Sequence, residues 1–558
     1  MSGALDTTKA VRPPGERRSG DDDLVQRLEK LNDIGTSLSA ERDINRLLET
    51  ILAAAKAIMR ADGGTLYRVT EDNTLRFEIV RTTSLKYYLG GTTGNPVPFY
   101  PVPLYKDGKP NHANISAYAA LTGRTVNIAD AYVEQGFDFS GTRNFDKKTG
   151  YRSKAFLTVP MKNHDNEIIG VLQLINPSDP RTGEIVAFSP ADQRLAESLA
   201  SQAAVALTNR MLINQLEELF ESLINMINTA IDEKSPNTGG HCQRVPSLTM
   251  MLAEAAHEAA AGPLAGFTMS DRDRYELKIA GLLHDCGKVT TPVHVVDKAT
   301  KLETIYDRIH LVDTRFEVLK RDAEIAALKE QAPLAARAAP QAERDAVDAR
   351  LRERSRQLDE DRAFLRICNV GGEAMRDADM EHVQRIAQYR WADVAGKDAA
   401  FLSDDETKNL TIRAGTLTPE ERKIINNHIV STINMLEALP WPKHLTNVPE
   451  YAGGHHERMD GKGCPKGLTR EQMSVQARVM GIADIFEALS AKDRPYKKGK
   501  TLTECLEILG KFRLNGHIDP DLFDIFVRKK VYQRYADEYM SKDQVDVVDE
   551  AKIPGFKP

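Results

Sequence analysis

The segment Gly281-Leu-Leu-His-Asp-Cys-Gly-Lys288 is the most informative stretch of this chain, because it places His284 directly before Asp285. Five more candidate ligands stand at separate places along the sequence: His241, His428, His455, His456 and Asp484. Together the seven residues supply imidazole nitrogens and carboxylate oxygens in numbers that suit two divalent metal ions.

This mixture of ligands favours one kind of chemistry. Neutral imidazoles bind first-row metals such as Fe, Mn, Co and Zn, and a carboxylate beside a histidine can bridge two ions. Two metal ions about 3.5–4 Å apart hold a phosphodiester and lower the pKa of a shared water, whose hydroxide attacks phosphorus. Lys288 follows His284 by about one helical turn, so in a helical segment its ammonium lies on the ligand face and can hold a phosphate oxygen.

Each of these residues also has an ordinary interpretation. A single histidine, such as His257 or His310, is more often a surface or packed residue than a ligand, and a His-Asp pair also occurs by chance. The doublet His455-His456, followed by Asp460-Gly461, is harder to explain by packing. The clusters taken together favour a metal site.

The motifs occur in an order that is known from one family, and residues 230–530 resemble an HD-GYP domain. The matching stretches are Gly240-His241, Arg244-Val245, His284–Lys288, Leu417-Thr418, Glu420-Glu421, His428, His455–Glu457, Asp460-Gly461, Asp484 and Asp493–Lys497. HD-GYP domains are the bacterial branch of the HD phosphohydrolases, and their activity is hydrolysis of cyclic di-GMP. The resemblance implies an all-helical HD bundle around two metal ions, with Fe or Mn expected and Zn, Co or Ni as alternatives.

The resemblance also implies roles for single residues. All seven histidines and aspartates become metal ligands, with Asp285 as the bridge between the ions. Lys288, Arg494 and Lys497 become phosphate contacts, although solvated charges are an alternative interpretation of Arg494 and Lys497.

Two positions depart from the family pattern. Family members have tyrosine where this chain has Cys464, a candidate substrate contact that offers neither aromatic area nor a phenol. Substrate affinity or specificity is therefore open, while the metal ligands are intact. Cys464 is itself a candidate soft ligand or redox-sensitive thiol, but a small buried residue is favoured. Members with a third metal have a carboxylate where this chain has Asn237, so two metals are favoured over three.

A long insertion separates His284 from the next ligand histidine, which leaves two candidates. His310 follows a segment that resembles the expected motif, but its distance from Leu302 is too short. The spacing from Leu417 to His428 is the one that the family requires, so His428 is the predicted ligand. The insertion, about 313–412, is rich in Ala, Arg, Glu, Leu and Asp, and it predicts a helical hairpin that forms a dimer contact, a lid or merely a solvated surface.

The N-terminal part predicts a small α+β domain. Residues 1–23 are expected to be a disordered tail, residues 24–61 a helix, and residues 64–69, 75–80, 156–161 and 168–175 strands, the last of them central. The domain, expected over 24–210, resembles a GAF domain in Arg143–Asp146, Thr149–Arg152 and Ile169–Asn176. The cyclic-nucleotide signature of phosphodiesterase GAF domains is only partly present, in Asn176, Phe188, Asp192 and Gln193. The resemblance implies a small-molecule ligand, with a cyclic nucleotide as one candidate and a mainly dimerising role as the alternative.

A continuous linker helix is predicted over 190–231. Its apolar residues alternate at spacings of four and three, which is a heptad seam: Leu212, Leu216, Leu219, Leu223, Met226 and Ala230. A parallel coiled coil that forms a homodimer is favoured over a single helix packed on the catalytic domain. That domain is expected over 232–540, with helices from Leu502 to Tyr539 and a tail over 541–558.

Composition limits the other partners and the location. The net charge of −6 argues against binding of a nucleic-acid polymer. No apolar run reaches the length of a membrane span, and the N-terminus has no signal-peptide core. Five scattered cysteines predict a reduced, cytoplasmic protein. The sequence as a whole predicts a GAF-regulated phosphodiesterase that hydrolyses cyclic di-GMP to pGpG or GMP. The alternatives are a scaffold that binds cyclic di-GMP without turnover, and a hydrolase of another cyclic nucleotide or dinucleotide.

Overall fold

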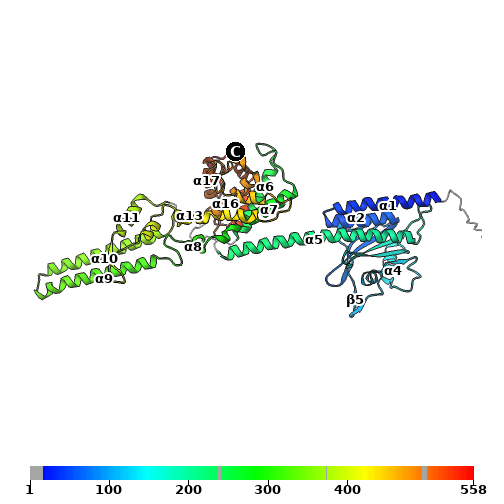
Figure 1. The fold of residues 1–558 in the computed structure, drawn as a ribbon, viewed down its shortest axis with the longest axis horizontal. Helices are drawn as coiled ribbons and strands as arrows, with labels where there is room; N and C mark the ends of the chain where they lie inside the picture. Colours follow the sequence, from blue (N-terminus) through cyan, green and yellow to red (C-terminus); the bar gives the residue numbers. More distant parts are fainter. Residues whose placement is uncertain (1–16, 235–239, 373, 493–498, 558) are drawn as a thin grey trace, which may run out of the picture. The chain divides into compact units, whose positions relative to one another are not determined.

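The computed structural model describes residues 17–234, 240–372, 374–492 and 499–557, with residues 17–24 described by their backbone alone. The chain folds as two compact units, Met1–Phe220 and Glu221–Pro558 (Figure 1). One long helix, α5 (Pro190–Lys234), contributes residues to both units.

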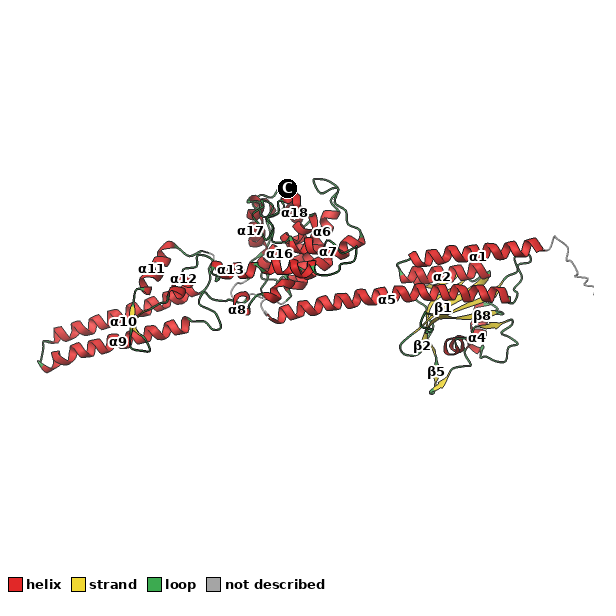
Figure 2. Cartoon of the chain, viewed as in Figure 1, coloured by secondary structure: helices red, strands yellow, loops and turns green. Residues whose placement is uncertain are grey.

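The N-terminal unit is an antiparallel sheet with helices on both faces (Figure 2). Its strands are β1 (Ala61–Val69), β2 (Thr74–Thr82), β3 (Tyr87–Gly90), β4 (Val102–Pro103), β5 (Tyr105–Lys106), β6 (Lys109–Pro110), β7 (Val126–Ile128), β8 (Phe156–Lys162) and β9 (Ile168–Pro177). The helices are α1 (Arg17–Ala40), α2 (Ile44–Met59), η1 (Gly91–Thr93), α3 (Ile115–Thr122) and α4 (Ser140–Thr149). The strand order is β3-β2-β1-β9-β8-β7, with β4 beside β2 and β5-β6 as a separate pair. The predicted α+β fold and the central position of β9 are confirmed.

Two predicted boundaries in this unit are wrong. The helix expected over 24–61 is divided, because α1 ends at Ala40 and α2 begins at Ile44. The Asp43 side chain accepts hydrogen bonds from the backbone N–H groups of Asn45 and Arg46, and so forms the N-terminal cap of α2. The expected tail is helical from Arg17 onward, since a helix that has formed extends at little cost. Residues 1–16 lie outside the described residues.

The linker helix is confirmed as α5, and its heptad seam faces solvent. All six seam residues are exposed, among them Leu216 at 64% and Met226 at 61%. The C-terminal turns of α5 instead bury Ile224 and Ile231 in the C-terminal unit. The helix therefore packs through a different face, and its apolar seam remains uncovered in the single chain.

The C-terminal unit is a helical bundle whose centre is α16, which buries Met480 and Phe486 completely. Its helices are α6 (His241–His257), α7 (Asp271–Leu283), η3 (Cys286–Thr290), α8 (Val293–Val296), α13 (Pro419–Asn426), α14 (His428–Glu437), α15 (Val448–Gly453), η4 (Arg470–Gln472), α16 (Val475–Ser490), α17 (Leu502–Leu514), α18 (Pro520–Arg528), α19 (Val531–Tyr539) and η5 (Glu550–Lys552). The helices expected from Leu502 to Tyr539 are thus confirmed.

The insertion has a hydrophobic core of its own, which includes Phe316, Leu358 and Phe401. Its elements are α9 (Ile309–Ala336), α10 (Gln341–Asn369), α11 (Asp377–Ala387), β10 (Arg390–Ala392), β11 (Asp398–Ala400) and α12 (Asp404–Leu410). The predicted helical hairpin is confirmed by α9 and α10, which lie side by side (Figure 1). The short β10-β11 hairpin was not predicted.

The expected C-terminal tail is wrong as well, because residues after 540 pack on the bundle. Gln544 is buried, and its amide nitrogen Nε2 donates to the carbonyls of Ser490 and Lys500 at 2.7 and 3.0 Å. Ile553 is buried too. Over the described part of the chain, no helix combines the length and apolarity needed to cross a bilayer.

Candidate metal centre

The seven predicted ligands converge in the C-terminal unit from five places in the sequence. His241 begins α6, His284 and Asp285 follow α7, His428 begins α14, His455 and His456 follow α15, and Asp484 lies within α16. Their donor atoms form two neighbouring groups of three, one of His241, His284 and Asp285 and one of His428, His455 and His456. Within each group the atoms lie within 4.8 Å of one another.

Asp285 lies between the two groups. Its Oδ2 is 3.0 Å from Nε2 of His241 and 3.3 Å from Nε2 of His284. Its Oδ1 faces the other group, 3.2 Å from Nε2 of His428. Asp484 adds an oxygen to the first group, with Oδ1 3.4 Å from Nε2 of His241. One carboxylate thus presents one oxygen to each group, which is the arrangement that a bridging ligand needs.

Three of the histidines are oriented in the same way, by a backbone carbonyl three residues earlier. The pairs are His284 Nδ1 with Gly281 O at 2.7 Å, His428 Nδ1 with Ile425 O at 2.5 Å, and His455 Nδ1 with Ala452 O at 2.6 Å. A carbonyl only accepts, so each Nδ1 carries the proton and each Nε2 keeps a free lone pair. The helix ends therefore select the tautomer that binds metal through Nε2.

Several of these lone pairs have no partner. Nε2 of His428, Nε2 of His455 and Oδ1 of Asp285 are buried and form no hydrogen bond with any described residue. Buried polar atoms are seldom left in this state, because each unpaired group costs free energy. Since all three atoms are acceptors that face one another, a cation satisfies them and a further acceptor does not. The residues present therefore fit a metal centre.

The electrostatics keep His455, His456 and Asp285 in the forms that bind metal. His241 differs: burial and Lys288 lower its pKa, but hydrogen bonds to Asp285, Asp484 and Glu487 outweigh them and hold the pKa well above its usual value. Burial, reinforced by His456 and His284, lowers the pKa of His455 well below its usual value. Burial also lowers the pKa of His456 to about 4. For Asp285, burial raises the pKa, but Lys288 and His284 outweigh it and hold the pKa well below the usual range. Neutral imidazoles and an ionised carboxylate are the forms that coordinate metal.

Lys288 reaches the site by a different route from the predicted one. Helix α7 ends at Leu283, and Lys288 lies in the 3₁₀ turn η3 instead of on a continuing α-helix. Its Nζ is still 2.5 Å from Oδ2 of Asp285. Gly287 allows this turn to pack closely against α14, because a Cβ there would lie 2.1 Å from the carbonyl oxygen of His428.

Glu487 is a site residue that the sequence analysis missed. It is 1% exposed, accepts from His241 Nδ1 at 2.5 Å and pairs with Arg244 at 2.7 Å. It orients His241, the fourth histidine, as the backbone carbonyls orient the other three. The available signal was its position one helical turn after Asp484 in α16.

Replacing Glu487 with Gln should weaken metal binding by about 10- to 100-fold, as is typical for a residue that orients a ligand histidine. The amide cannot match the carboxylate in holding the Nδ1 proton of His241. Competition with a chelator measures the change. Glu276→Gln is the control, because Glu276 is also buried but holds Asn447 at 2.6 Å instead of a ligand. Equal metal affinity in the two variants would show that Glu487 has no role in orienting His241.

Comparison with known proteins agrees with the two-unit structure. A GAF-domain family model matches residues 43–207, and HD-domain models match residues 238–361 and 404–522. The chain carries a GAF domain followed by an HD domain. The first HD match runs into the insertion as far as residue 361, and the second begins at residue 404, near the end of the insertion.

Relatives of this chain include named phosphodiesterases. A cyclic di-GMP phosphodiesterase of Pseudomonas aeruginosa is 36% identical over 116 residues, which are 21% of this chain and 27% of that protein. A 3′3′-cGAMP-specific phosphodiesterase of Vibrio cholerae is 32% identical over 166 residues, 30% of this chain and 33% of that protein. A dual 3′,5′-cyclic-AMP and -GMP phosphodiesterase of Takifugu rubripes is 33% identical over 124 residues, 22% of this chain and 13% of that protein. The chain spans a third or less of the length of each.

The other residues that the sequence analysis named in the HD domain lie outside the two groups of donor atoms or outside the described residues. The rejected candidate His310 is exposed. Cys464 is half-buried, and its N–H donates to the carbonyl of His456 at 3.2 Å, so its loop lies against the ligand doublet. Burial raises the pKa of its thiol, and its sulfur belongs to neither group of donor atoms among the described residues. Arg494, Lys497 and Asn237 lie outside the described residues.

The GAF domain encloses a cavity of about 340 Å³ between the sheet and helices α3 and α4. Aromatic side chains contribute much of its lining: Tyr67, Phe77, Phe99, Phe139, Phe145, Tyr151 and Phe156. Two of these, Phe145 and Tyr151, belong to the motifs that carried the resemblance to GAF domains. The described residues that line it include no lysine or arginine.

The residues of the partial cyclic-nucleotide signature are not among those that line this cavity, although Nδ2 of Asn176 donates to the hydroxyl of Tyr151, which does line it, at 2.9 Å. Two of them stabilise the fold. Asn176 is fully buried and accepts from the N–H groups of Lys154 and Ala155 at 2.8 and 3.1 Å. Asp192 accepts from the N–H of Ser189 at 2.8 Å and pairs with Arg27. These contacts hold β8 and α5 in place.

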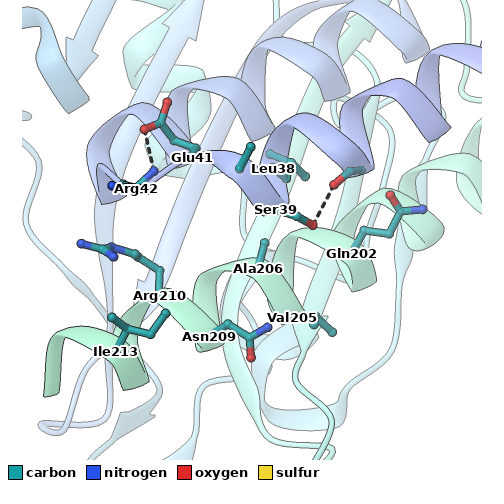
Figure 3. Close-up of a pocket in the computed structure, with 12 residues that line it drawn as sticks. Leu38, Ser39, Glu41, Arg42, Gln202, Val205, Ala206, Asn209, Arg210 and Ile213 are labelled. Carbon is teal, nitrogen blue, oxygen red and sulfur yellow. Dashed lines mark hydrogen bonds between the residues drawn. The ribbon is translucent and has the colours of Figure 1, made fainter. Parts of the chain in front are cut away.

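A second, larger hollow of about 790 Å³ lies between the end of α1 and α5 (Figure 3). Its α5 side includes Val205 and Asn209, which continue the spacings of the heptad seam upstream of Leu212. The seam therefore extends along α5 into the GAF domain.

Proposed function

We propose that this protein is a metal-dependent phosphodiesterase that hydrolyses cyclic di-GMP to pGpG, GMP or both. The position of Asp285 between two groups of histidines with unpaired, inward-facing acceptors carries this proposal. Relatives named as cyclic di-GMP and 3′3′-cGAMP phosphodiesterases support a cyclic dinucleotide as the substrate.

Each group of ligands would hold one divalent metal ion. His241, His284 and Asp484 would hold the first, His428, His455 and His456 the second, and Asp285 both. Fe or Mn is the expected metal, with Zn, Co or Ni as alternatives, because imidazole and carboxylate donors suit all of them. Bound there, a metal pair lowers the pKa of water and polarises the phosphodiester. Lys288 would neutralise charge on the phosphate oxygens beside Asp285, with Arg494 and Lys497 as further phosphate contacts.

Two alternatives keep the same metal centre. In the first, Cys464 or the insertion prevents turnover, and the protein binds cyclic di-GMP as a signalling scaffold. In the second, the substrate is another cyclic nucleotide or dinucleotide. The position of Cys464 beside His456 supports a role in substrate selection, because its loop borders the ligands.

Turnover by protein purified without oxygen and loaded with Fe or Mn tests these alternatives. Cyclic di-GMP, 3′3′-cGAMP and cyclic GMP are supplied separately, and the products are resolved by chromatography. A linear product from cyclic di-GMP at the highest rate supports the proposal. Binding of cyclic di-GMP without product, at about two metals per chain, favours the scaffold, and Cys464→Tyr is then the variant to assay.

We also propose that the GAF domain regulates the HD domain by binding a small molecule in its aromatic cavity. Aromatic side chains offer ring faces on which a planar base can stack, so a cyclic nucleotide is one candidate. The lining offers no cationic side chain to balance a phosphate, which also favours uncharged aromatic ligands.

A homodimer through α5 is the proposed assembly. Between Leu212 and Ala230 the seam is flanked by uncharged residues such as Ile213, Gln215 and Ile227, whereas Glu217 and Glu221 lie elsewhere around the helix. A second copy can therefore approach without repulsion between like charges. Asn209 at a core position favours two strands in parallel register.

Replacing Leu216 and Leu223 with Lys should convert a dimer to a monomer, because it buries two like charges per strand in the seam. Light scattering after gel filtration measures the mass. Glu217→Lys, which changes charge outside the seam, should remain dimeric. A wild-type monomer at micromolar concentration would refute the proposed assembly.

A further inference from the structure

A buried lysine near the base of the insertion holds two distant parts of the HD domain together. Lys298 is 5% exposed and follows α8, on the segment that issues from the Asp285 turn. Its Nζ donates to both carboxylate oxygens of Glu421 at 2.8 Å and to Oδ1 of Asn409 at 2.9 Å. Lysine is seldom buried without such partners, because the lone charge is costly in a low dielectric.

Glu421 leads from this ion pair toward a metal ligand. It lies in α13, where it also accepts from the N–H of Thr418 at 2.8 Å and so fixes the start of that helix. Ile425, in the last turn of α13, provides the carbonyl that accepts from Nδ1 of His428 at 2.5 Å. The position of α13 therefore determines the orientation of the His428 ring.

His428 is held from its other side by the turn that carries Lys288. The N–H of Gly287 donates to Oγ1 of Thr432 at 2.9 Å, and Oγ1 of Thr290 donates to Oγ of Ser431 at 3.1 Å. These contacts fix α14 after His428, whereas the Lys298–Glu421 pair fixes α13 before it. Both sets of contacts join the Asp285 segment to the His428 segment, although the insertion separates them in sequence.

We propose that Lys298 and Glu421 are positioning residues for the second metal ion, because they hold α13 so that His428 meets Asp285 across the insertion. This inference rests on the proposed metal centre. It also assigns a function to the glutamate of the Leu417-Thr-Pro-Glu-Glu421 motif, which no ligand role explains. Neither residue contacts the donor atoms, so the effect passes through Ile425 and the His428 ring.

Other ion pairs near the insertion do not lead to a ligand. Arg315 pairs with Glu406 at 2.7 Å and donates to the carbonyl of Phe401 at 2.8 Å, all within the insertion. Lys301 donates to the carbonyls of Leu410 and Ile412 at 3.0 and 2.8 Å. These contacts stabilise the insertion and its base. Replacing Arg315 is therefore a matched control for the loss of a buried cation.

The test compares Lys298→Met, Lys298→Arg, Lys298→Met with Glu421→Gln, and Arg315→Met in the full chain. Each protein is stripped of metal and titrated with Co²⁺ against a competing chelator, with the visible spectrum and the bound metal per chain recorded. Thermal unfolding of the same samples reports stability separately.

Lys298→Met should lower the Co²⁺ affinity of one of the two sites about tenfold and leave the affinity of the other unchanged. Tenfold is the low end of the loss that is typical when a residue supporting a metal ligand is replaced. Lys298→Arg should recover much of this loss, since a guanidinium can also pair with Glu421. The double variant should regain stability, because no buried charge is left alone, but should keep the weakened site. Arg315→Met should lose stability while it binds both ions normally.

Two results would overturn the inference. The first is wild-type affinity at both sites in Lys298→Met. The second is equal weakening of both sites that follows the melting temperature in every variant, which is the behaviour of a purely structural ion pair. A wild-type protein that binds no Co²⁺ is a different result, because it would refute the metal centre itself.

Discussion

Replacing His284 and Asp285 with alanine together should abolish hydrolysis and bound metal. Asp285 is the residue that faces both groups of histidines, and His284 is fully buried beside it. We expect turnover to fall by more than about 10²–10³-fold, the effect of losing a single preorganised electrostatic contact in other enzymes, because here the whole centre is lost. Metal analysis and product chromatography on the same preparations measure both effects.

The control for this variant is His310→Ala. His310 follows the competing motif but is exposed and belongs to neither group of donor atoms among the described residues, so its replacement should change neither metal content nor rate. Unchanged metal content and hydrolysis in the His284/Asp285 variant would refute the proposed centre. Loss of metal with retained hydrolysis would place the reaction at another site.

Replacing Gly287 with alanine should damage both stability and the second group of ligands. The added Cβ would lie 2.1 Å from the carbonyl oxygen of His428 and 2.5 Å from the nitrogen of Thr432, which are backbone atoms that cannot rotate away. Overpacking of this kind typically costs about 1–3 kcal/mol. We expect a destabilisation in that range by urea unfolding, together with weaker metal binding, because α14 must move away from the Asp285 turn.

Gly266→Ala separates this effect from the general change of a glycine. A Cβ at Gly266 has no atom within 4 Å and the backbone there is not left-handed, so this variant should be nearly neutral. If Gly287→Ala had the same stability and metal affinity as Gly266→Ala, the close approach of η3 to α14 would contribute to neither property.

The sequence by itself named the candidate residues of the site. The resemblance of several short motifs to HD-GYP domains predicted all seven ligands, and the motif spacing of that family selected His428 over His310. The central strand β9 and the long helix α5 were also predictable, because a buried strand and a heptad seam each leave a periodic pattern in a short window. Such features depend on neighbours in sequence.

Tertiary structure decided what depends on neighbours in space. Glu487 acts on His241 from a different helix, and its position one helical turn after Asp484 does not show by itself which distant histidine it contacts. The break between α1 and α2 depends on a single cap at Asp43, which weighs little against an apolar pattern.

The same reason explains the C-terminal segment and the ion pair beneath the insertion. The sequence predicted a tail after residue 540, yet Gln544 is buried because Ser490 and Lys500 offer it two carbonyls. Lys298 and Glu421 are separated by the whole insertion and meet only in the folded domain. Local sequence predicted the candidate ligands and the main elements that carry them, whereas long-range packing decided which side chains hold those residues in place.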